Sequence, residues 1–122
     1  MPRSALNLAL LLATTLLISA CSKQSIYDSA IGWERSSAGL ETAEVSIGEL
    51  DIAYLRSKEA VEGDTLVLIH GFGANKDNWT RLAKEFKGEF NVYAIDLPGH
   101  GDSSKPLDIG YRFEDQVDYV HQ

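Results

Sequence analysis

The alternation of hydrophobic and polar residues predicts a sheet made of a hairpin and two buried strands. In residues 43–56, apolar side chains occupy every second position on both sides of Gly48-Glu49, and glycine at the first place of a two-residue connection favours a type II′ turn. We expect an antiparallel hairpin at the sheet edge. Residues 66–69 are continuously apolar, which is typical of a central strand buried on both faces, and residues 90–97 predict a second buried strand.

Two further segments carry apolar residues at helical spacing. In residues 77–86 the positions i, i+3, i+4 and i+7 predict one buried helix face, made of Trp79, Leu82, Ala83 and Phe86. Three residues could cap the start of this helix, and the sequence does not choose between them: Asn75, Asp77 and Asn78. A second helix is expected to begin near Tyr111 or Arg112, and no stop signal ends it before the last residue.

The loops after the two buried strands are rich in glycine. Residues 70–73 read His-Gly-Phe-Gly, and residues 98–103 read Pro-Gly-His-Gly-Asp-Ser. Glycines around one large residue indicate a sharp turn in which the backbone comes close to another group. Ligands of parallel α/β sheets bind at the carboxyl ends of the strands, so we expect the functional site at these two loops.

The N-terminal residues have the three-part layout of an export signal. One basic side chain in residues 1–3 precedes a mainly apolar stretch, residues 5–18, which is short for a transmembrane span of about 20 residues. Ile18-Ser19-Ala20-Cys21 then resembles the lipobox of bacterial lipoproteins. The resemblance implies a signal peptide in residues 1–20, an acylated Cys21 and a membrane anchor. A plain secretory signal is the alternative.

Composition limits what the rest of the chain can be. The 122 residues are 44% hydrophobic, carry a formal net charge of −7 and include one cysteine. This describes one globular domain or part of one, without an intrachain disulfide. The acidic balance argues against a nucleic-acid partner. We interpret residues 21–42 as a tether and N-terminal segment, partly packed or helical, and residues 43–122 as a partial α/β domain.

Both glycine-rich loops resemble those of the α/β-hydrolase fold. The resemblance rests on His-Gly-Phe-Gly at 70–73, on Trp79 nine residues after that histidine, and on Asp-Leu-Pro-Gly-His-Gly-Asp-Ser at 96–103. It covers roughly residues 44–122 and implies the N-terminal portion of the fold, an edge hairpin followed by parallel strands with flanking helices. Together with the lipoprotein-like start it is similar to bacterial lipases and esterases. This implies a small-molecule or lipid ester substrate, no cofactor, and an exported protein at the outer membrane or the periplasmic face.

The resemblance also assigns roles to residues of both loops. The backbone N–H of Phe72 is implied to be one donor of an oxyanion hole, because a preorganised donor stabilises the negative charge that develops on an attacked ester carbonyl. His70, Gly71 and Gly73 are implied to support this first loop. A further set is implied to shape the second loop: Asp96, Gly99, His100, Gly101 and Ser103.

The nucleophile, acid and base of such an enzyme have no match in the sequence. No Gly-x-Ser-x-Gly elbow occurs, and the residues around Ser103 do not form one. His70 is not the expected base, because in this fold the base follows the nucleophile along the chain. We therefore expect the N-terminal piece of a longer, membrane-tethered serine hydrolase that is inactive by itself. Trp79 is expected in the core, and the three histidines lack the spacing of metal ligands.

Three other interpretations stay open. The same fold also carries dehalogenase or epoxide-hydrolase chemistry, although those enzymes commonly have proline where this chain has Gly73. The glycines at 71 and 73, with Asp96 25 residues after the first of them, imitate a dinucleotide-binding fingerprint, but Lys76 occupies its third glycine position. The third interpretation is a lipoprotein module without catalytic activity.

Overall fold

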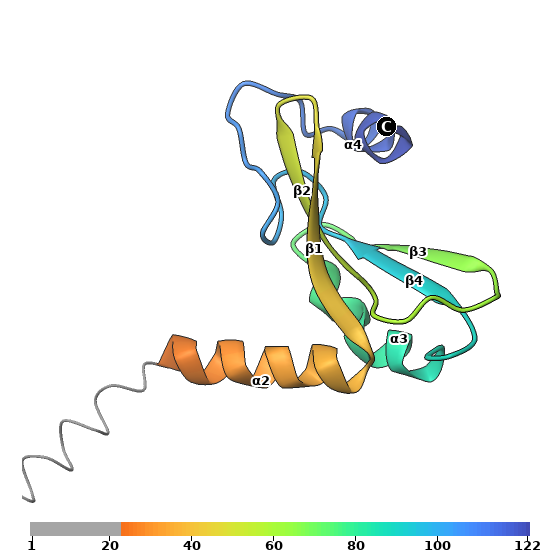
Figure 1. The fold of residues 1–122 in the computed structure, drawn as a ribbon. Coiled ribbons are helices and arrows are strands. Elements are labelled where there is room, and N and C mark those ends of the chain that lie inside the picture. Colours follow the sequence, from red (N-terminus) through yellow and green to blue (C-terminus); the bar gives the residue numbers. More distant parts are fainter. Residues whose placement is uncertain (1–22) are drawn as a thin grey trace, which may run out of the picture. The chain divides into compact units, whose positions relative to one another are not determined.

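The computed structural model describes residues 23–122, so the predicted signal peptide of residues 1–20 and the acylation of Cys21 lie outside the described part. Residues 33–122 form one compact unit, and the contacts discussed below belong to it. Helix α2 is Lys23–Ser37 (Figure 1), and its residues 33–37 belong to this unit. Within the described part of the chain, no helix combines the length and the apolar character that crossing a membrane requires.

Four strands form one mixed sheet in the order β1-β2-β4-β3 (Figure 1). The first two pair as the predicted hairpin, and a φ of +60° at Gly48, with no positive φ at Glu49, fits the type II′ turn. β4 is antiparallel to β2 and parallel to β3, which makes the fold an α/β arrangement as expected. The strands are β1 Leu40–Ile47, β2 Leu50–Ser57, β3 Thr65–Ile69 and β4 Asn91–Ile95.

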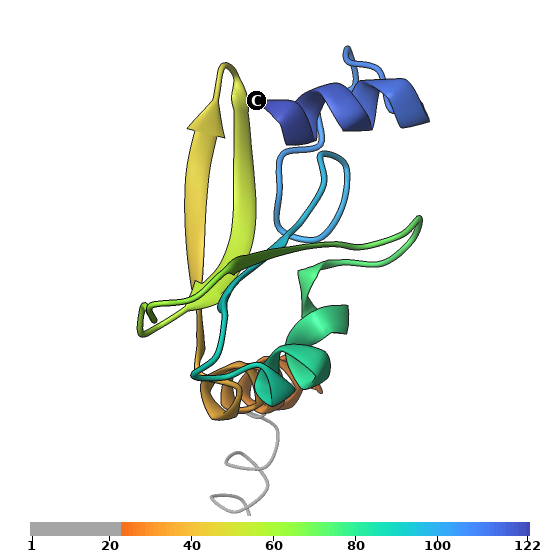
Figure 2. The same cartoon turned by 90° about the vertical axis from the view of Figure 1, so that its right-hand side faces the viewer.

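The predicted first helix is split into a 3₁₀ turn, η1 Lys76–Trp79, and an α-helix, α3 Thr80–Glu85. Asn75 is the cap: its Oδ1 accepts a hydrogen bond from the Asp77 N–H at 2.9 Å, and the Asn75 N–H donates to Asn78 Oδ1 at 3.1 Å. The second helix, α4 Phe113–His121, begins after Arg112 as predicted. In both views, α4 lies near the turn of the β1–β2 hairpin and α3 lies toward the opposite end of that hairpin (Figures 1 and 2).

The hydrophobic core lies between one face of the sheet and the η1–α3 segment. Trp79 and Phe86 pack against it, as predicted, whereas Leu82 is exposed. Thr80 and Ala83 are the helix residues that face the sheet, and a helix that advances about 100° per residue turns Leu82 away from that direction. Six residues form the buried cluster: Ala38, Leu40, Leu55, Ala83, Val92 and Ala94.

The prediction that residues 66–69 form a central strand buried on both faces is wrong for this structure. Among the described residues, β3 is an edge strand that pairs with β4 alone. Leu68 packs against the core, but Val67 and Ile69 on the opposite face are 55% and 42% exposed. A continuous apolar run gives a strand two apolar faces, yet burial requires a covering layer on each. The described residues leave these two side chains of β3 uncovered.

Candidate active site

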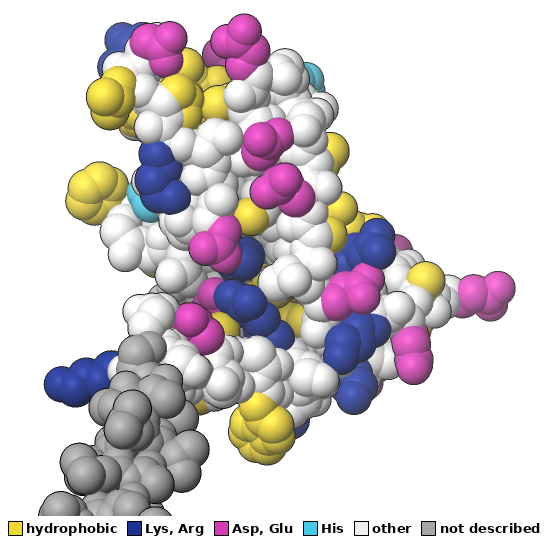
Figure 3. All heavy atoms as spheres, turned by 60° about the vertical axis from the view of Figure 1, so that its left-hand side comes forward, with side chains coloured by type: hydrophobic (Ala, Val, Ile, Leu, Met, Phe, Trp, Pro, Cys, Tyr) yellow, Lys and Arg dark blue, Asp and Glu magenta, His cyan; other side chains and the backbone are white. Residues whose placement is uncertain are grey.

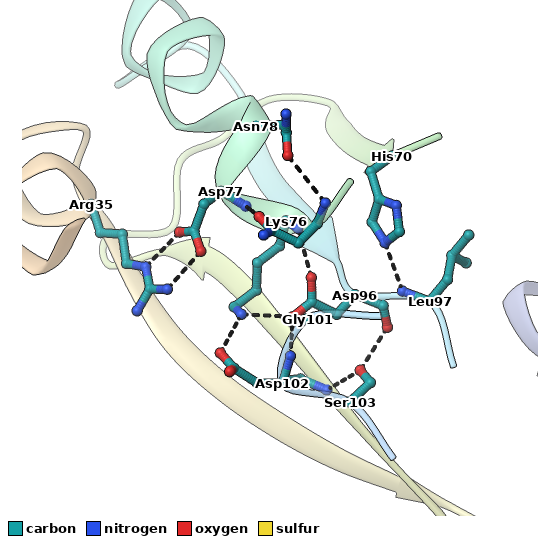
Figure 4. Close-up of polar contacts among 12 residues, drawn as sticks. Arg35, His70, Lys76, Asp77, Asn78, Asp96, Leu97, Gly101, Asp102 and Ser103 are labelled. Atoms are coloured by element: carbon teal, nitrogen blue, oxygen red, sulfur yellow. Dashed lines mark hydrogen bonds and ion pairs between the residues drawn. The ribbon is translucent and has the colours of Figure 1, made fainter. Parts of the chain in front are cut away.

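The histidine of the first loop is bonded into the structure through both ring nitrogens. His70 is 5% exposed, and its Nε2 accepts a hydrogen bond from the Leu97 N–H at 3.1 Å (Figure 4). Because Nε2 accepts, Nδ1 carries the proton and donates to the Gly71 carbonyl at 2.8 Å. The imidazole therefore joins the end of β3 to the end of β4 and has no free nitrogen for proton transfer.

Phe72 lies at the apex of a tight turn. The Ala74 N–H donates to the Gly71 carbonyl at 3.2 Å, and Gly73 has a φ of +71°, a conformation that strains any residue with a side chain. Gly71 has neither a positive φ nor a neighbour that a side chain would meet. The Phe72 ring is fully exposed and stands edge-on to the His100 ring, with the centroids 6.3 Å apart.

A buried carboxylate organises the second loop. Asp96, at the end of β4, is fully buried and accepts three hydrogen bonds, from the Lys76 N–H at 2.6 Å, from Lys76 Nζ at 2.6 Å and from the Asp102 N–H at 2.8 Å. Lys76 Nζ also donates to the Asp102 carboxylate at 2.6 Å. The ammonium group thus lies between two carboxylates, one buried and one largely exposed (Figure 4).

The charges of this cluster shift two pKa values. Burial by itself would lower the pKa of Lys76, but the hydrogen bonds and charges of Asp102 and Asp96 outweigh it, so the pKa lies above its ordinary value of 10.5. The hydrogen bond and charge of Lys76 lower the pKa of Asp102 below its ordinary value of 3.8. Both groups are therefore charged at neutral pH.

The remaining residues of the second loop lock its backbone. Ser103 Oγ donates to the Asp96 carbonyl at 2.6 Å and accepts from the Ala53 N–H at 2.9 Å, so this hydroxyl is held in the interior. Gly101 has a φ of +50°, and a Cβ there would collide with the Asp96 carboxylate. Gly99 has a φ of +85°, and a Cβ there would collide with the ring of Tyr111.

A pocket of about 830 Å³ opens between the two loops and α4. Its walls are mainly apolar, and they include Phe72, Leu107, Phe113 and Val117. His100 contributes polar atoms, and its Nδ1 donates to the Pro98 carbonyl at 3.1 Å. Such a cavity suits a ligand with a sizeable apolar part and a few polar atoms.

No group of three His, Cys, Asp or Glu side chains in residues 23–122 is placed to hold a metal ion. On the visible face in Figure 3, Lys and Arg side chains stand next to Asp and Glu side chains rather than forming a field of one sign.

The structure brings together the residues that the sequence placed at the two loops, and it adds two that the sequence did not single out. Lys76 and Asp102 complete the cluster around Asp96, at sequence separations of 20 and 6 residues. The residues next to Lys76 and Asp102 do not predict these roles, because a lysine or an aspartate in a polar segment is normally a surface residue. The same contacts overturn the dinucleotide interpretation, since the buried Asp96 is paired with Lys76 and is closed to a ribose hydroxyl.

The hairpin, the parallel strands and the glycine turn at the carboxyl end of β3 are elements of an α/β-hydrolase fold. The chain belongs to the α/β-hydrolase fold superfamily, and its residues 64–122 match the sequence profile of that family.

Known relatives include lipases and other hydrolases. Over 92 residues the chain is 39% identical to Lipase 3 of Moraxella sp. (strain TA144), which covers 75% of this chain and 29% of the lipase. The crystal structure of a membrane phospholipase A superposes with a TM-score of 0.81 and 41% identity, covering 99% of this chain and 39% of that one. Haloalkane dehalogenase DatA from Agrobacterium tumefaciens C58 superposes with a TM-score of 0.61 and 30% identity, covering 70% of this chain and 29% of DatA. The chain thus spans well under half of each of these proteins.

Proposed function

We propose that this chain is the N-terminal part of a serine hydrolase that cleaves carboxylic esters, lipid esters among them. The observation that carries the proposal is the position of Phe72. Its loop stands at the carboxyl end of β3, at the wall of a large apolar pocket, and both loop ends are bonded to the end of β4. The similarity to Lipase 3 and to the membrane phospholipase A supports an ester substrate with an apolar part.

In this proposal the chain supplies electrostatic stabilisation rather than a nucleophile. A serine from another part of the protein attacks the ester carbonyl, and the carbonyl oxygen becomes negative. The Phe72 N–H donates a hydrogen bond to that oxygen, and a second N–H follows the nucleophile. The alcohol leaves, and water then hydrolyses the acyl-enzyme. His70 holds the loop through both ring nitrogens.

The test compares two substitutions of Phe72 in the full-length protein. Phe72→Ala keeps the backbone N–H, whereas Phe72→Pro removes it. The proposal expects the proline variant to lose about 10²- to 10³-fold in kcat relative to the alanine variant, which is the typical effect of one lost oxyanion donor. Thermal unfolding of both variants controls for folding. Equal kcat values in two folded variants would remove Phe72 from the mechanism.

A second chemistry is favoured by the likeness to haloalkane dehalogenase DatA. A fluorophosphonate probe and a haloalkane distinguish the two. Covalent labelling by the probe with ester turnover supports the serine hydrolase. Halide release without labelling moves the assignment to dehalogenase chemistry.

We further propose that the protein is exported and held at a membrane by acylated Cys21. The support is the sequence Ile18-Ser19-Ala20-Cys21, together with the similarity to a membrane phospholipase A. More than one acyl chain would make a stable anchor, because each buried CH₂ adds about 0.8 kcal/mol. Mass spectrometry of the N-terminal peptide tests the acylation. Cys21→Ser should move the protein from the membrane fraction to the soluble fraction, and an unchanged membrane fraction would exclude this anchor.

A further inference from the structure

The loop that presents Phe72 is fastened at its two ends to two adjacent residues, Leu97 and Asp96. At its start, His70 Nε2 accepts from the Leu97 N–H at 3.1 Å. At its end, the Lys76 N–H donates to Asp96 Oδ1 at 2.6 Å. The dipeptide Asp96-Leu97 at the end of β4 therefore sets the separation of the loop ends (Figure 4).

The fastening at Lys76 depends on charge. Asp96 is fully buried, and a buried carboxylate is costly unless it is paired and hydrogen-bonded. Lys76 is only 2% exposed and contacts this carboxylate twice, through its backbone N–H and through its ammonium group. Without the ammonium, the carboxylate would lose its buried cation and one of its three hydrogen bonds.

We propose that Lys76 and Asp96 are positioning residues, which hold the Phe72 N–H where the oxyanion of the ester develops. This inference rests on the proposed function. Phe72 lies four residues before Lys76, and the turn between them is closed by the Ala74 N–H to Gly71 carbonyl bond of 3.2 Å. Releasing the Lys76 end lets the whole turn shift. An oxyanion donor acts in the transition state, so its displacement lowers kcat and leaves KM nearly unchanged.

The experiment compares Lys76→Met with Arg35→Met in the full-length protein. Arg35 is the control, because its guanidinium donates two hydrogen bonds to the carboxylate of Asp77, the residue after Lys76, at 2.6 and 2.7 Å and makes no hydrogen bond to residues 70–76. Each variant removes one cation that pairs with a carboxylate: Lys76 belongs to the 3₁₀ turn η1, and Arg35 belongs to α2 and pairs with Asp77 of that turn. With a soluble short-chain ester we expect Lys76→Met to lower kcat about 10- to 100-fold, with KM within about threefold, and Arg35→Met to leave kcat within about twofold.

Equal kcat values in Lys76→Met and Arg35→Met would overturn the proposal. If Lys76→Met yields no soluble protein, Asp96→Asn takes its place, because asparagine fills the same volume and removes only the charge and one acceptor oxygen. A normal kcat in Asp96→Asn would also overturn the proposal.

Hydrogen exchange separates this inference from the proposed function. Amides of residues 71–75 should exchange at least about tenfold faster in Lys76→Met than in the wild type or in Arg35→Met, with no substrate present. If the wild type cleaves no ester, the proposed function fails, and exchange alone decides whether Lys76 fastens the loop. If exchange is unchanged in an active ester hydrolase, the positioning role fails by itself.

Discussion

Substituting Gly101 by alanine tests the buried carboxylate from the second loop. Gly101 has a φ of +50°, and its added Cβ would meet all three atoms of the Asp96 carboxyl group. Gly48, in the hairpin turn, has a similar φ of +60°, but nothing lies where its Cβ would point. Gly48→Ala should therefore destabilise the protein through backbone strain alone. Gly101→Ala should destabilise it through the same strain and through displacement of the Asp96 carboxylate.

The magnitudes follow from these two differences. A left-handed conformation costs an L-residue about 1–2 kcal/mol, which is the whole effect expected for Gly48→Ala. Displacing Asp96 weakens hydrogen bonds to a charged group, each contributing about 1.5–3 kcal/mol. Losing one of the three raises the expected cost of Gly101→Ala to about 2.5–5 kcal/mol.

Urea unfolding measures the free energy of unfolding of each variant in the full-length protein, and the two values are then compared. Because both substitutions add the same methyl group to a glycine of nearly the same φ, effects on the unfolded chain cancel to a good approximation. A difference below about 0.5 kcal/mol between the two variants would show that Asp96 is not held as described.

Three further predictions concern stability. The free energy of unfolding of the wild type should exceed that of Asp102→Asn by no more than about 1 kcal/mol, because Asp102 is largely exposed. The pKa of Asp102 is lowered in the folded state, so this advantage is present above its ordinary pKa of 3.8 and is lost as the pH falls further. The difference in urea midpoint between the wild type and Asp102→Asn should therefore shrink between pH 7 and pH 2, and a difference that does not change with pH would contradict the pair. Leu55→Ala, in the core, should cost about 2–5 kcal/mol, whereas Val67→Ala, on the exposed face of β3, should cost less than about 1 kcal/mol; equal costs in thermal unfolding would contradict the assigned core. Asn75→Ala should cost about 0.5–2 kcal/mol through loss of its cap, and an unchanged melting temperature would contradict the capping role.

Local features of the fold could be predicted from the sequence because their causes are local. Gly48-Glu49 specifies its turn through backbone conformations that glycine alone adopts easily. The strand composition places β2 and β4 within a few residues, and the start of α4 follows Arg112 as expected. The cap at Asn75 was one of three candidates, and the structure chooses it through the two reciprocal hydrogen bonds of a capping box.

The features that the sequence did not predict depend on contacts between distant residues. Burial of residues 66–69 depends on the elements that cover each face of β3, and a run of apolar residues does not show whether those elements are present. The pairing of Lys76 with Asp96 joins positions 20 residues apart, with no periodicity to mark it. The two loops, in contrast, were found from their glycines and from the family resemblance, whereas the ion pair that connects them was not.

The strand order β1-β2-β4-β3 also has a consequence for synthesis of the protein. β4 lies between β2 and β3, so β3 leaves the ribosome before the strand it must pair with exists. From Ile69 to Ile95 the ribosome adds 26 residues, which takes roughly 1–5 s at about 5–20 residues per second. During that interval the nascent chain carries an apolar strand whose backbone N–H and C=O groups have no sheet partner. An exposed apolar segment of this kind is what a chaperone binds. The hairpin can close early, but the first loop reaches its final position only after β4 has entered the sheet.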